Sequence, residues 1–120
     1  MEHFFDSYAI LEVIAQSPGY TAFKDEAIIT TALNIAETHY ILTGKAGETA
    51  ADEIIDHLDV SLLELTKPIA IEASKLRHRH QKQKMSYADC LGYIVALKHG
   101  LKFLTGDDAF KGMESVEFVK

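Results

Sequence analysis

Short apolar runs alternate with segments of helical periodicity along the whole chain of 120 residues. An apolar run at residues 3–5 precedes residues 7–16, in which apolar side chains recur on one helical face. The same alternation continues to the C-terminal end. It predicts strands at 3–5, 27–30, 60–65, 101–105 and 116–119, helices at 7–16, 31–43, 48–58, 68–82 and 86–99, and one helical turn at 107–112.

Glycine and proline residues set the expected limits of several of these elements. Ser17-Pro18-Gly19 breaks the first helix, while Gly44 and Gly100 are expected to end the helices before them. Alternation of strands and helices predicts a mainly parallel sheet with helices on both faces. The expected fold is therefore α/β, a three-layer α/β/α sandwich, in a single domain over residues 1–120.

Carboxylates follow two of the predicted strands. Asp6 comes directly after the first strand, and Asp107 comes shortly after the fourth. Because parallel strands end at the same edge of a sheet, these two residues are expected to share that edge. Glu37 lies in the helix after the second strand, and Asp89 lies in the first turn of a later helix. Carboxylates that meet at one edge are the oxygen ligands that Mg²⁺ and Mn²⁺ prefer, so a metal site is predicted.

Each acidic residue also has a purely structural interpretation. The alternatives are an N-cap at Asp6 or Ser7, a capping box from Ser86 to Asp89, a cap at Asp107 or Asp108, and a solvated helix residue at Glu37. Each alternative accounts for one residue at a time. None of them accounts for the placement of acids after both strands, with small hydroxyl residues alongside.

Charge distribution bears on the ligands that the protein can attract, and cysteine content bears on its disulfides. The formal net charge is −6, but it is uneven, with six acidic residues and no Lys or Arg in residues 48–64, and five basic residues and no acid in residues 75–84. Such a division can steer an anion to one side, or both runs can be solvated helix faces. A single cysteine excludes an internal disulfide. Without a basic leader or a long apolar run, the protein is expected to be cytoplasmic.

The acidic motifs, taken in order, resemble those of PIN-domain ribonucleases of the VapC-like toxin type. The family begins with an apolar strand, an Asp and a small residue, as in HFFDSYAI, and has a Glu after its second strand, as in ALNIAETHY. Its third acid begins a helix, here in MSYADCLGYIVALKHG. Its last strand leads into Thr-x-Asp-x-x-Phe, here in LKFLTGDDAFKGMESVEFV. The resemblance covers essentially the whole chain.

The resemblance implies a metal-dependent ribonuclease that uses Mg²⁺ or Mn²⁺. Its catalytic and metal-binding residues would be Asp6, Glu37, Asp89 and Asp107, with hydroxyl support from Ser7 and Thr105 and with Asp108 as the cap of the last turn. Cys90 is interpreted as a buried packing residue. The bases nearest the third acidic motif are the candidates for binding RNA phosphates, namely Arg77, Arg79, Lys82 and Lys84.

The resemblance also implies partners. VapC-like proteins pair with a cognate antitoxin and form homodimers, and the expected substrate is single-stranded or looped RNA. An antitoxin Arg that enters the acidic cluster is one hypothesis for inhibition, because a guanidinium pairs bidentately with carboxylates.

Three other functions share parts of this pattern. A PIN-like fold can be a binding module without catalysis, and another metal-dependent phosphohydrolase would share the metal but not the substrate. A receiver-type signalling domain would need an acid directly after its central strand. With residues 60–65 taken as that strand, no suitable phosphate acceptor follows.

Overall fold

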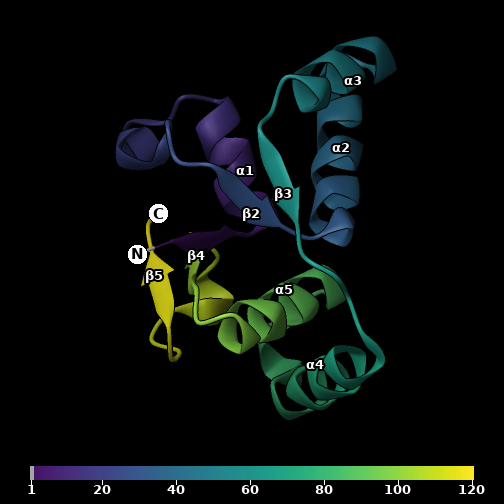
Figure 1. The fold of residues 1–120 in the computed structure, drawn as a ribbon, viewed down its shortest axis with the longest axis vertical. Coiled ribbons are helices and arrows are strands. Elements are labelled where there is room, and N and C mark those ends of the chain that lie inside the picture. Colours follow the sequence, from purple (N-terminus) through teal and green to yellow (C-terminus); the bar gives the residue numbers. More distant parts are fainter. Residues whose placement is uncertain (1) are drawn as a thin grey trace.

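Five parallel strands form the centre of the molecule, and the computed structural model describes residues 2–120. The strand order is β3-β2-β1-β4-β5, so β1 is central (Figure 1). The bounds are β1 (His3–Phe5), β2 (Ile28–Thr30), β3 (Val60–Leu62), β4 (Lys102–Thr105) and β5 (Val116–Phe118). The predicted α/β class with a parallel sheet is confirmed, and all four strand pairings are parallel.

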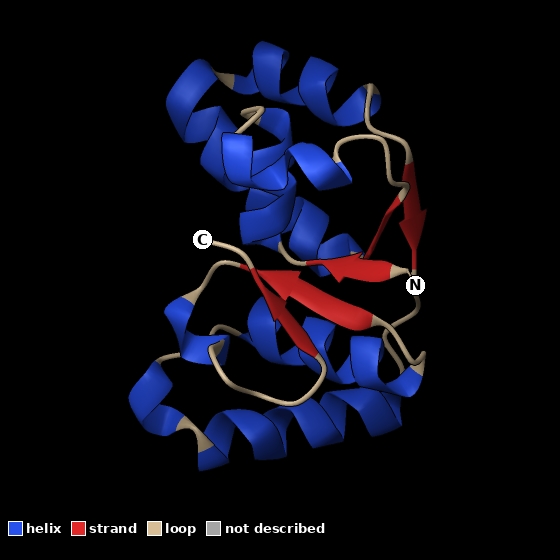
Figure 2. Cartoon of the chain, turned by 90° about the vertical axis from the view of Figure 1, so that its left-hand side faces the viewer, coloured by secondary structure: helices blue, strands red, loops and turns tan. Residues whose placement is uncertain are grey.

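Helices cover both faces of this sheet, which lies between two helical layers in Figure 2. The helices α1, α2 and α3 lie on one side, and α4 and α5 lie on the other. Their bounds are α1 (Ser7–Ile14), α2 (Ala32–Ala46), α3 (Glu48–Asp56), α4 (Lys67–Arg79) and α5 (Tyr87–Lys98), with short 3₁₀ helices η1 (Pro18–Phe23), η2 (Gln81–Gln83) and η3 (Asp108–Phe110). Within residues 2–120, no helix has both the length and the apolar character that a bilayer crossing requires.

The central strands are apolar on both sides because each side meets a helical layer. Phe4 and Phe103 pack with α4 and α5, whereas Phe5 and Leu104 pack with α1 and η1. Neighbouring side chains of a strand point to opposite faces, so two adjacent aromatic residues of β1 serve two separate cores. The strands β1 and β4 are aligned so that Phe5 is opposite Leu104. Both strands therefore end at the same level.

The order of the strands reverses between β1 and β4. The chain runs outward from β1 through β2 to β3, and then returns to β4 and β5 on the other side. In open parallel sheets, the carboxyl ends of strands at such a reversal are the usual place for a binding site. The structure also corrects one premise of the receiver alternative, because β3 is an edge strand and β1 is central. Strand order depends on tertiary packing, which a local apolar pattern does not encode.

Several elements differ in length from their predicted limits. The strand expected at 60–65 ends at Leu62, the helix expected at 68–82 ends at Arg79, and residues 18–23 form a 3₁₀ helix that was not anticipated. The helix expected to end at Gly44 continues to Ala46. The residue that ends it is Gly47, whose φ of 90° is a conformation that glycine adopts readily.

We predict that Gly44→Ala increases the free energy of unfolding by about 0.5–1 kcal/mol, because glycine is unfavourable within a helix. A Cβ atom at Gly44 would meet no atom within 4 Å. Urea denaturation of both proteins measures the difference. Gly47→Ala is the matched control and should decrease stability, since alanine disfavours positive φ. A loss of stability in Gly44→Ala would contradict the extension of α2 beyond Gly44.

Candidate active site

Asp6 lies at the carboxyl end of the central strand and is almost fully buried, with 1% of its surface exposed. Its backbone N–H donates a hydrogen bond to the carbonyl oxygen of Leu104 at 3.3 Å, which ties it to β4. Its carboxylate accepts a hydrogen bond from the backbone N–H of Ala9 at 2.7 Å and caps α1. Strand pairing and helix capping thus fix this side chain at the reversal of strand order.

The surroundings of Asp6 favour its protonated form. Burial is the main cause, and it raises the pKa of Asp6 from 3.8 to about 7. Hydrogen bonds from the Thr105 hydroxyl and the Ala9 N–H act in the opposite direction. The charges of Asp89 and Asp107 raise the pKa of Asp6 further. These three acidic residues are therefore close enough for their charges to repel one another.

Asp89 and Glu37 approach this centre from two different helices. Asp89 and Ser86 form the predicted capping box of α5, in which the Ser86 N–H donates to Asp89 at 2.8 Å and Ser86 Oγ accepts from the Asp89 N–H at 3.0 Å. Ser86 Oγ also donates to Glu37 Oε2 at 3.5 Å. Burial raises the pKa of Asp89, and the charges of Asp107 and Glu37 add to this effect, against the hydrogen bonds from Ser86. The charges of Asp6, Asp89 and Asp107 thus interact with one another, whereas Glu37 is linked to the group through Asp89 and Ser86.

Asp107 and Asp108 have different environments, and the residue that caps the last turn is Asp107. Asp107 accepts a hydrogen bond from the Ala109 N–H at 3.0 Å, so it is Asp107 that caps η3. The prediction that Asp108 caps this turn is wrong, because the chain turns one residue earlier. Asp108 is exposed and forms an ion pair with Lys120 Nζ at 2.7 Å, and that hydrogen bond lowers the pKa of Asp108. Thr105 Oγ1 accepts from the Asp107 N–H at 3.0 Å, which places this hydroxyl between Asp6 and Asp107.

Gly106 gives the turn between Thr105 and Asp107 the space that it needs. A Cβ atom at this position would overlap the ring of Tyr8 and lie 2.5 Å from the carbonyl oxygen of Val119. Both contacts are closer than atoms of a folded protein tolerate. The glycine that separates the strand from its acid is therefore a packing requirement.

Among residues 2–120, the Ser7 hydroxyl hydrogen-bonds to Asn34 and to no acidic side chain, so its support of the acids or of a metal-bound water stays a prediction. Its hydroxyl donates to the carbonyl oxygen of Asn34 at 3.3 Å and accepts from Asn34 Nδ2 at 3.3 Å. Asn34 is fully buried and also accepts a hydrogen bond from the Thr31 hydroxyl at 2.7 Å. This polar network joins α1 to α2 one helical turn before Glu37. Sequence reasoning missed Asn34, since an Asn on the inner face of a helix has no distinct signal.

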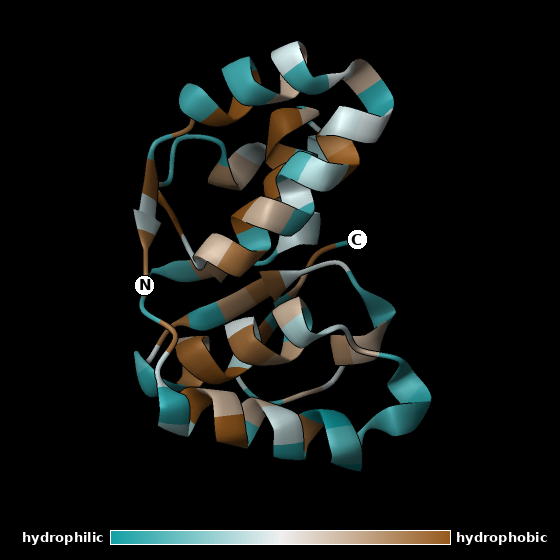
Figure 3. Cartoon of the chain, turned by 90° about the vertical axis from the view of Figure 1, so that its right-hand side faces the viewer, coloured by the Kyte–Doolittle hydropathy of each residue, from teal (hydrophilic) through white to brown (hydrophobic). Residues whose placement is uncertain are grey.

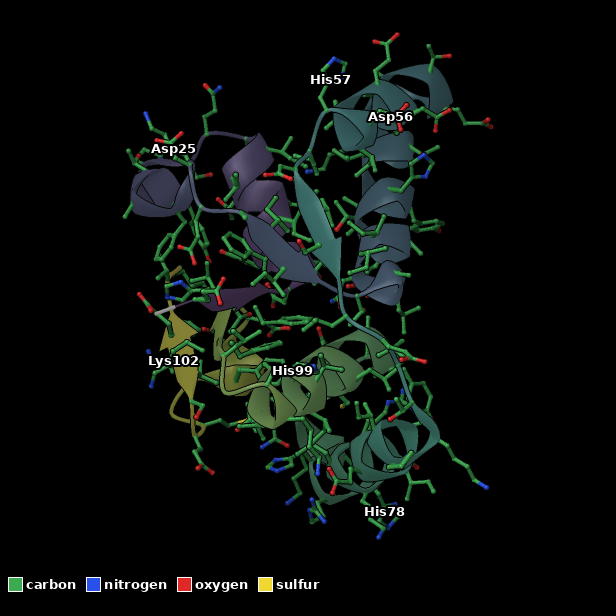
Figure 4. All side chains as sticks on the ribbon, in the orientation of Figure 1. Asp25, Asp56, His57, His78, His99 and Lys102 are labelled. Atoms are coloured by element: carbon green, nitrogen blue, oxygen red, sulfur yellow. The ribbon has the colours of Figure 1, made fainter. Side chains whose placement is uncertain are left out.

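The donor chemistry of the site fits a hard divalent cation. Each of the three Asp residues uses a carboxylate oxygen to cap a helix and supplies only oxygen donors, the type that Mg²⁺ and Mn²⁺ prefer. Over residues 2–120, no group of three or more Asp, Glu, His or Cys side chains lies in an arrangement that holds a metal ion without further movement. Three of the histidines, His57, His78 and His99, belong to the ends of three different helices (Figure 4).

The predicted RNA-binding bases are exposed, and the predicted packing cysteine is buried. Arg77 and Arg79 belong to the last turn of α4, and Lys82 and Lys84 lie in and after η2. The acidic helix α3 lies at the opposite end of the long axis from α4 (Figure 1). Burial raises the pKa of Cys90 to about 11, which keeps its thiol protonated near neutral pH.

We predict that Asp6→Asn stabilises the protein above pH 7 when divalent cations are absent. Asn retains the helix cap but carries no charge. A carboxyl whose pKa is about 7 in the folded state and 3.8 when unfolded lowers stability as pH rises from about 4 to 7. Asp6→Asn should therefore exceed the wild type by about 1–3 kcal/mol at pH 8 and differ little at pH 4.

Denaturant unfolding in the presence of a chelator, repeated across this pH range, measures the effect. The raised pKa of His3 also makes stability fall with pH, so only the difference between the two proteins reports on Asp6. Asp108→Asn removes an exposed carboxylate from the same edge and should not stabilise the protein. A variant Asp6→Asn that is less stable than the wild type at every pH would contradict the account.

The chain is similar to known proteins in its sequence and in its fold. The family model described as the PIN domain matches residues 4–115. No curated protein sequence matches significantly. The solved structure of VapC20 from Mycobacterium tuberculosis, a sarcin–ricin loop cleaving toxin, is similar with a TM-score of 0.82 and 18% identity, over 99% of this chain and 100% of that chain.

Two further solved structures have a similar fold. One is a toxin–antitoxin complex from Klebsiella pneumoniae, with a TM-score of 0.71 and 17% identity over 97% of this chain and 96% of that chain. The other is VapBC2 from Rickettsia felis bound to a promoter DNA fragment, with a TM-score of 0.74 and 14% identity over 100% of both chains. At these low identities the structural similarity shows the fold alone. The family model, in contrast, matches residues 4–115 and shows the family. The chain therefore belongs to the PIN domain family, as the order of its acidic motifs indicated.

Proposed function

We propose that this protein is an endoribonuclease that depends on Mg²⁺ or Mn²⁺ and acts as the toxin of a type II toxin–antitoxin pair. The observation that carries the proposal is the group of acids at the reversal of strand order, in which burial, and then the neighbouring charges, raise the pKa of Asp6 and of Asp89. Membership of the PIN domain family supports it. The proposed catalytic and metal-binding residues are Asp6, Glu37, Asp89 and Asp107.

A cation is the simplest partner for such a group of acids. If the four acids held Mg²⁺ or Mn²⁺, the cation would offset the repulsion between the carboxylates and would supply Lewis-acid chemistry for attack by water on a phosphodiester. Burial raises the pKa of Asp6 to about 7, so without the cation this carboxyl is partly protonated near neutral pH. Cation binding at Asp6 should therefore release that proton.

The chain holds its acids with different degrees of constraint. Asp6 is fixed by the pairing of β1 with β4 and by its cap on α1. Asp89 is fixed by the two hydrogen bonds with Ser86. Within residues 2–120, the Glu37 side chain has one hydrogen bond, from Ser86 at 3.5 Å, so this longer side chain has more freedom to adjust. Two rigid acids and one adjustable acid suit a site that must orient a phosphodiester before it is cut.

The substrate must approach an acidic site, and this requires basic residues elsewhere. The run from Lys75 to Lys84 supplies them beside the start of α5, which carries Asp89. A polyanion would be attracted to the α4 end and repelled from α3 at the other end. Single-stranded or looped RNA fits best, because its bases are free to contact side chains.

The proposed partners are a cognate antitoxin and a second copy of the chain, in the cytoplasm. Two of the similar structures contain toxin–antitoxin pairs, which supports the first partner.

We predict that the wild-type protein cuts single-stranded RNA in Mn²⁺ or Mg²⁺ and not in a chelator. Asp107→Asn and Asp89→Asn should each reduce the rate by at least about 100-fold, because each removes a charged ligand of the cation. Asp108→Asn is the matched control. It removes a carboxylate next to Asp107 that is paired with Lys120, so the rate should stay near that of the wild type.

Gel analysis of a mixed panel of labelled RNAs measures these rates, with circular dichroism to verify the fold of each variant. Equal rates for Asp107→Asn and Asp108→Asn would contradict the site assignment. Cleavage that persists in the chelator would contradict metal dependence. A folded wild type that cuts no RNA under any condition would contradict the enzymatic function and favour a binding module.

A further inference from the structure

A pocket outside the acidic cluster lies between the C-terminal end of α4 and the start of α5. Its volume is about 360 Å³, within the range of small-ligand sites. This α4–α5 pocket is lined by Arg77, His80, Gln81, Lys84, Met85 and Tyr87, among others. Within residues 2–120, no Asp or Glu contributes to its lining. Figure 3 shows the adjoining end of α4 as a strongly hydrophilic segment. The pocket therefore has the charge that an anion needs.

Arg77 is held in a fixed orientation at this pocket. Its Nε donates a hydrogen bond to the carbonyl oxygen of Met85 at 2.9 Å. Its Cζ lies 4.2 Å from the centre of the Tyr87 ring, a cation–π arrangement. Among the described residues 2–120, Arg77 forms no ion pair with a carboxylate. Its outer N–H groups thus remain free for a phosphate.

Tyr87 provides a flat and partly open surface next to this arginine. Its surface is 53% exposed even though one face of the ring lies against Arg77. An aromatic ring supported in this way loses little freedom when a base stacks on it. Stacking on aromatic rings is the common way in which proteins hold single-stranded RNA.

The pocket is joined directly to the acidic cluster through α5. Tyr87 is the first residue of that helix, directly after Ser86 and two residues before Asp89. Ser86 contacts both Glu37 and Asp89. Tyr87 and Asp89 are two positions apart in the first turn of α5 and therefore project from different sides of the helix, about 10 Å apart. A short stretch of single-stranded RNA can span this separation.

We propose that the α4–α5 pocket is a nucleotide subsite, in which a base stacks on Tyr87 while Arg77 contacts the phosphate beside it. The inference rests on the proposed ribonuclease function and specifies how the substrate is held. Stacking does not depend on base identity, so this subsite sets the position of the strand and leaves sequence preference to other contacts. Lys84 adds positive charge at the pocket.

The test measures RNA binding separately from cleavage. The full chain carrying Asp6→Asn is kept in a chelator so that the RNA stays intact, and fluorescence anisotropy gives Kd for short labelled oligoadenylate. Tyr87→Leu should weaken binding by about tenfold, whereas Tyr87→Phe should leave it unchanged, because stacking is worth about 1–3 kcal/mol per base. Tyr40→Leu removes an exposed tyrosine from α2 and serves as the matched control, with no expected effect.

Two further measurements separate stacking from charge. The Tyr87→Leu effect should disappear when the oligonucleotide lacks bases, since the backbone alone cannot stack. Arg77→Gln should decrease the slope of log Kd against log salt by about one, as expected for a lost phosphate contact. Thermal melts verify that Tyr87→Leu remains folded.

Failure of this inference is distinguishable from failure of the proposed function. If the wild type cuts RNA with its metal and Tyr87→Leu binds RNA as tightly as Tyr87→Phe, the subsite is wrong and the nuclease stands. An equal loss in Tyr40→Leu would likewise overturn the subsite. If the wild type cuts no RNA in the presence of Mn²⁺ or Mg²⁺ and the Asp6→Asn protein binds none, both proposals are wrong.

Discussion

The site depends on the burial of the Asp6 carboxylate beside two other acidic residues, at the end of the central strand. Asp6 has almost no access to solvent, and Asp89 and Asp107 raise its pKa further. Such an arrangement is unfavourable for folding, because burial and like charges both oppose ionisation. It is tolerated because the Thr105 hydroxyl and the Ala9 N–H donate to this carboxylate. A cation would remove the remaining repulsion, which links the stability of the chain to its proposed chemistry.

Structural and functional interpretations of the acidic residues turn out to be compatible. Asp6 and Asp107 are N-caps, and Asp89 completes the capping box of α5, so each acid also has the structural role that its local sequence predicts. The same helix ends bring the three carboxylates close enough for their charges to interact. Capping orients each carboxylate, and the partial positive charge of a helix N-terminus favours its ionised form. The caps therefore hold in place a group of charges that would otherwise separate.

The sequence predicted the features that depend on local pattern and on the geometry of parallel sheets. Alternating strands and helices indicated the fold, and the shared edge of parallel strands placed Asp6 beside Asp107. Features that depend on tertiary packing were missed. The role of Gly44 was misjudged because a glycine inside a helix resembles one at its end, and the positive φ belongs to Gly47. The contact of Ser86 with Glu37, and of Arg77 with Tyr87, exists only because separate helices pack together.

We propose that the acids at the reversal of strand order together bind a divalent cation. The most direct test is calorimetric titration of the full chain with Mn²⁺, with Mg²⁺ as competitor. We predict saturable Mn²⁺ binding that releases protons near pH 7, is lost in Asp6→Asn and strongly weakened in Glu37→Gln, and persists in Asp108→Asn. Binding that is absent in the wild type, or equally strong in Asp6→Asn and the wild type, would contradict the claim.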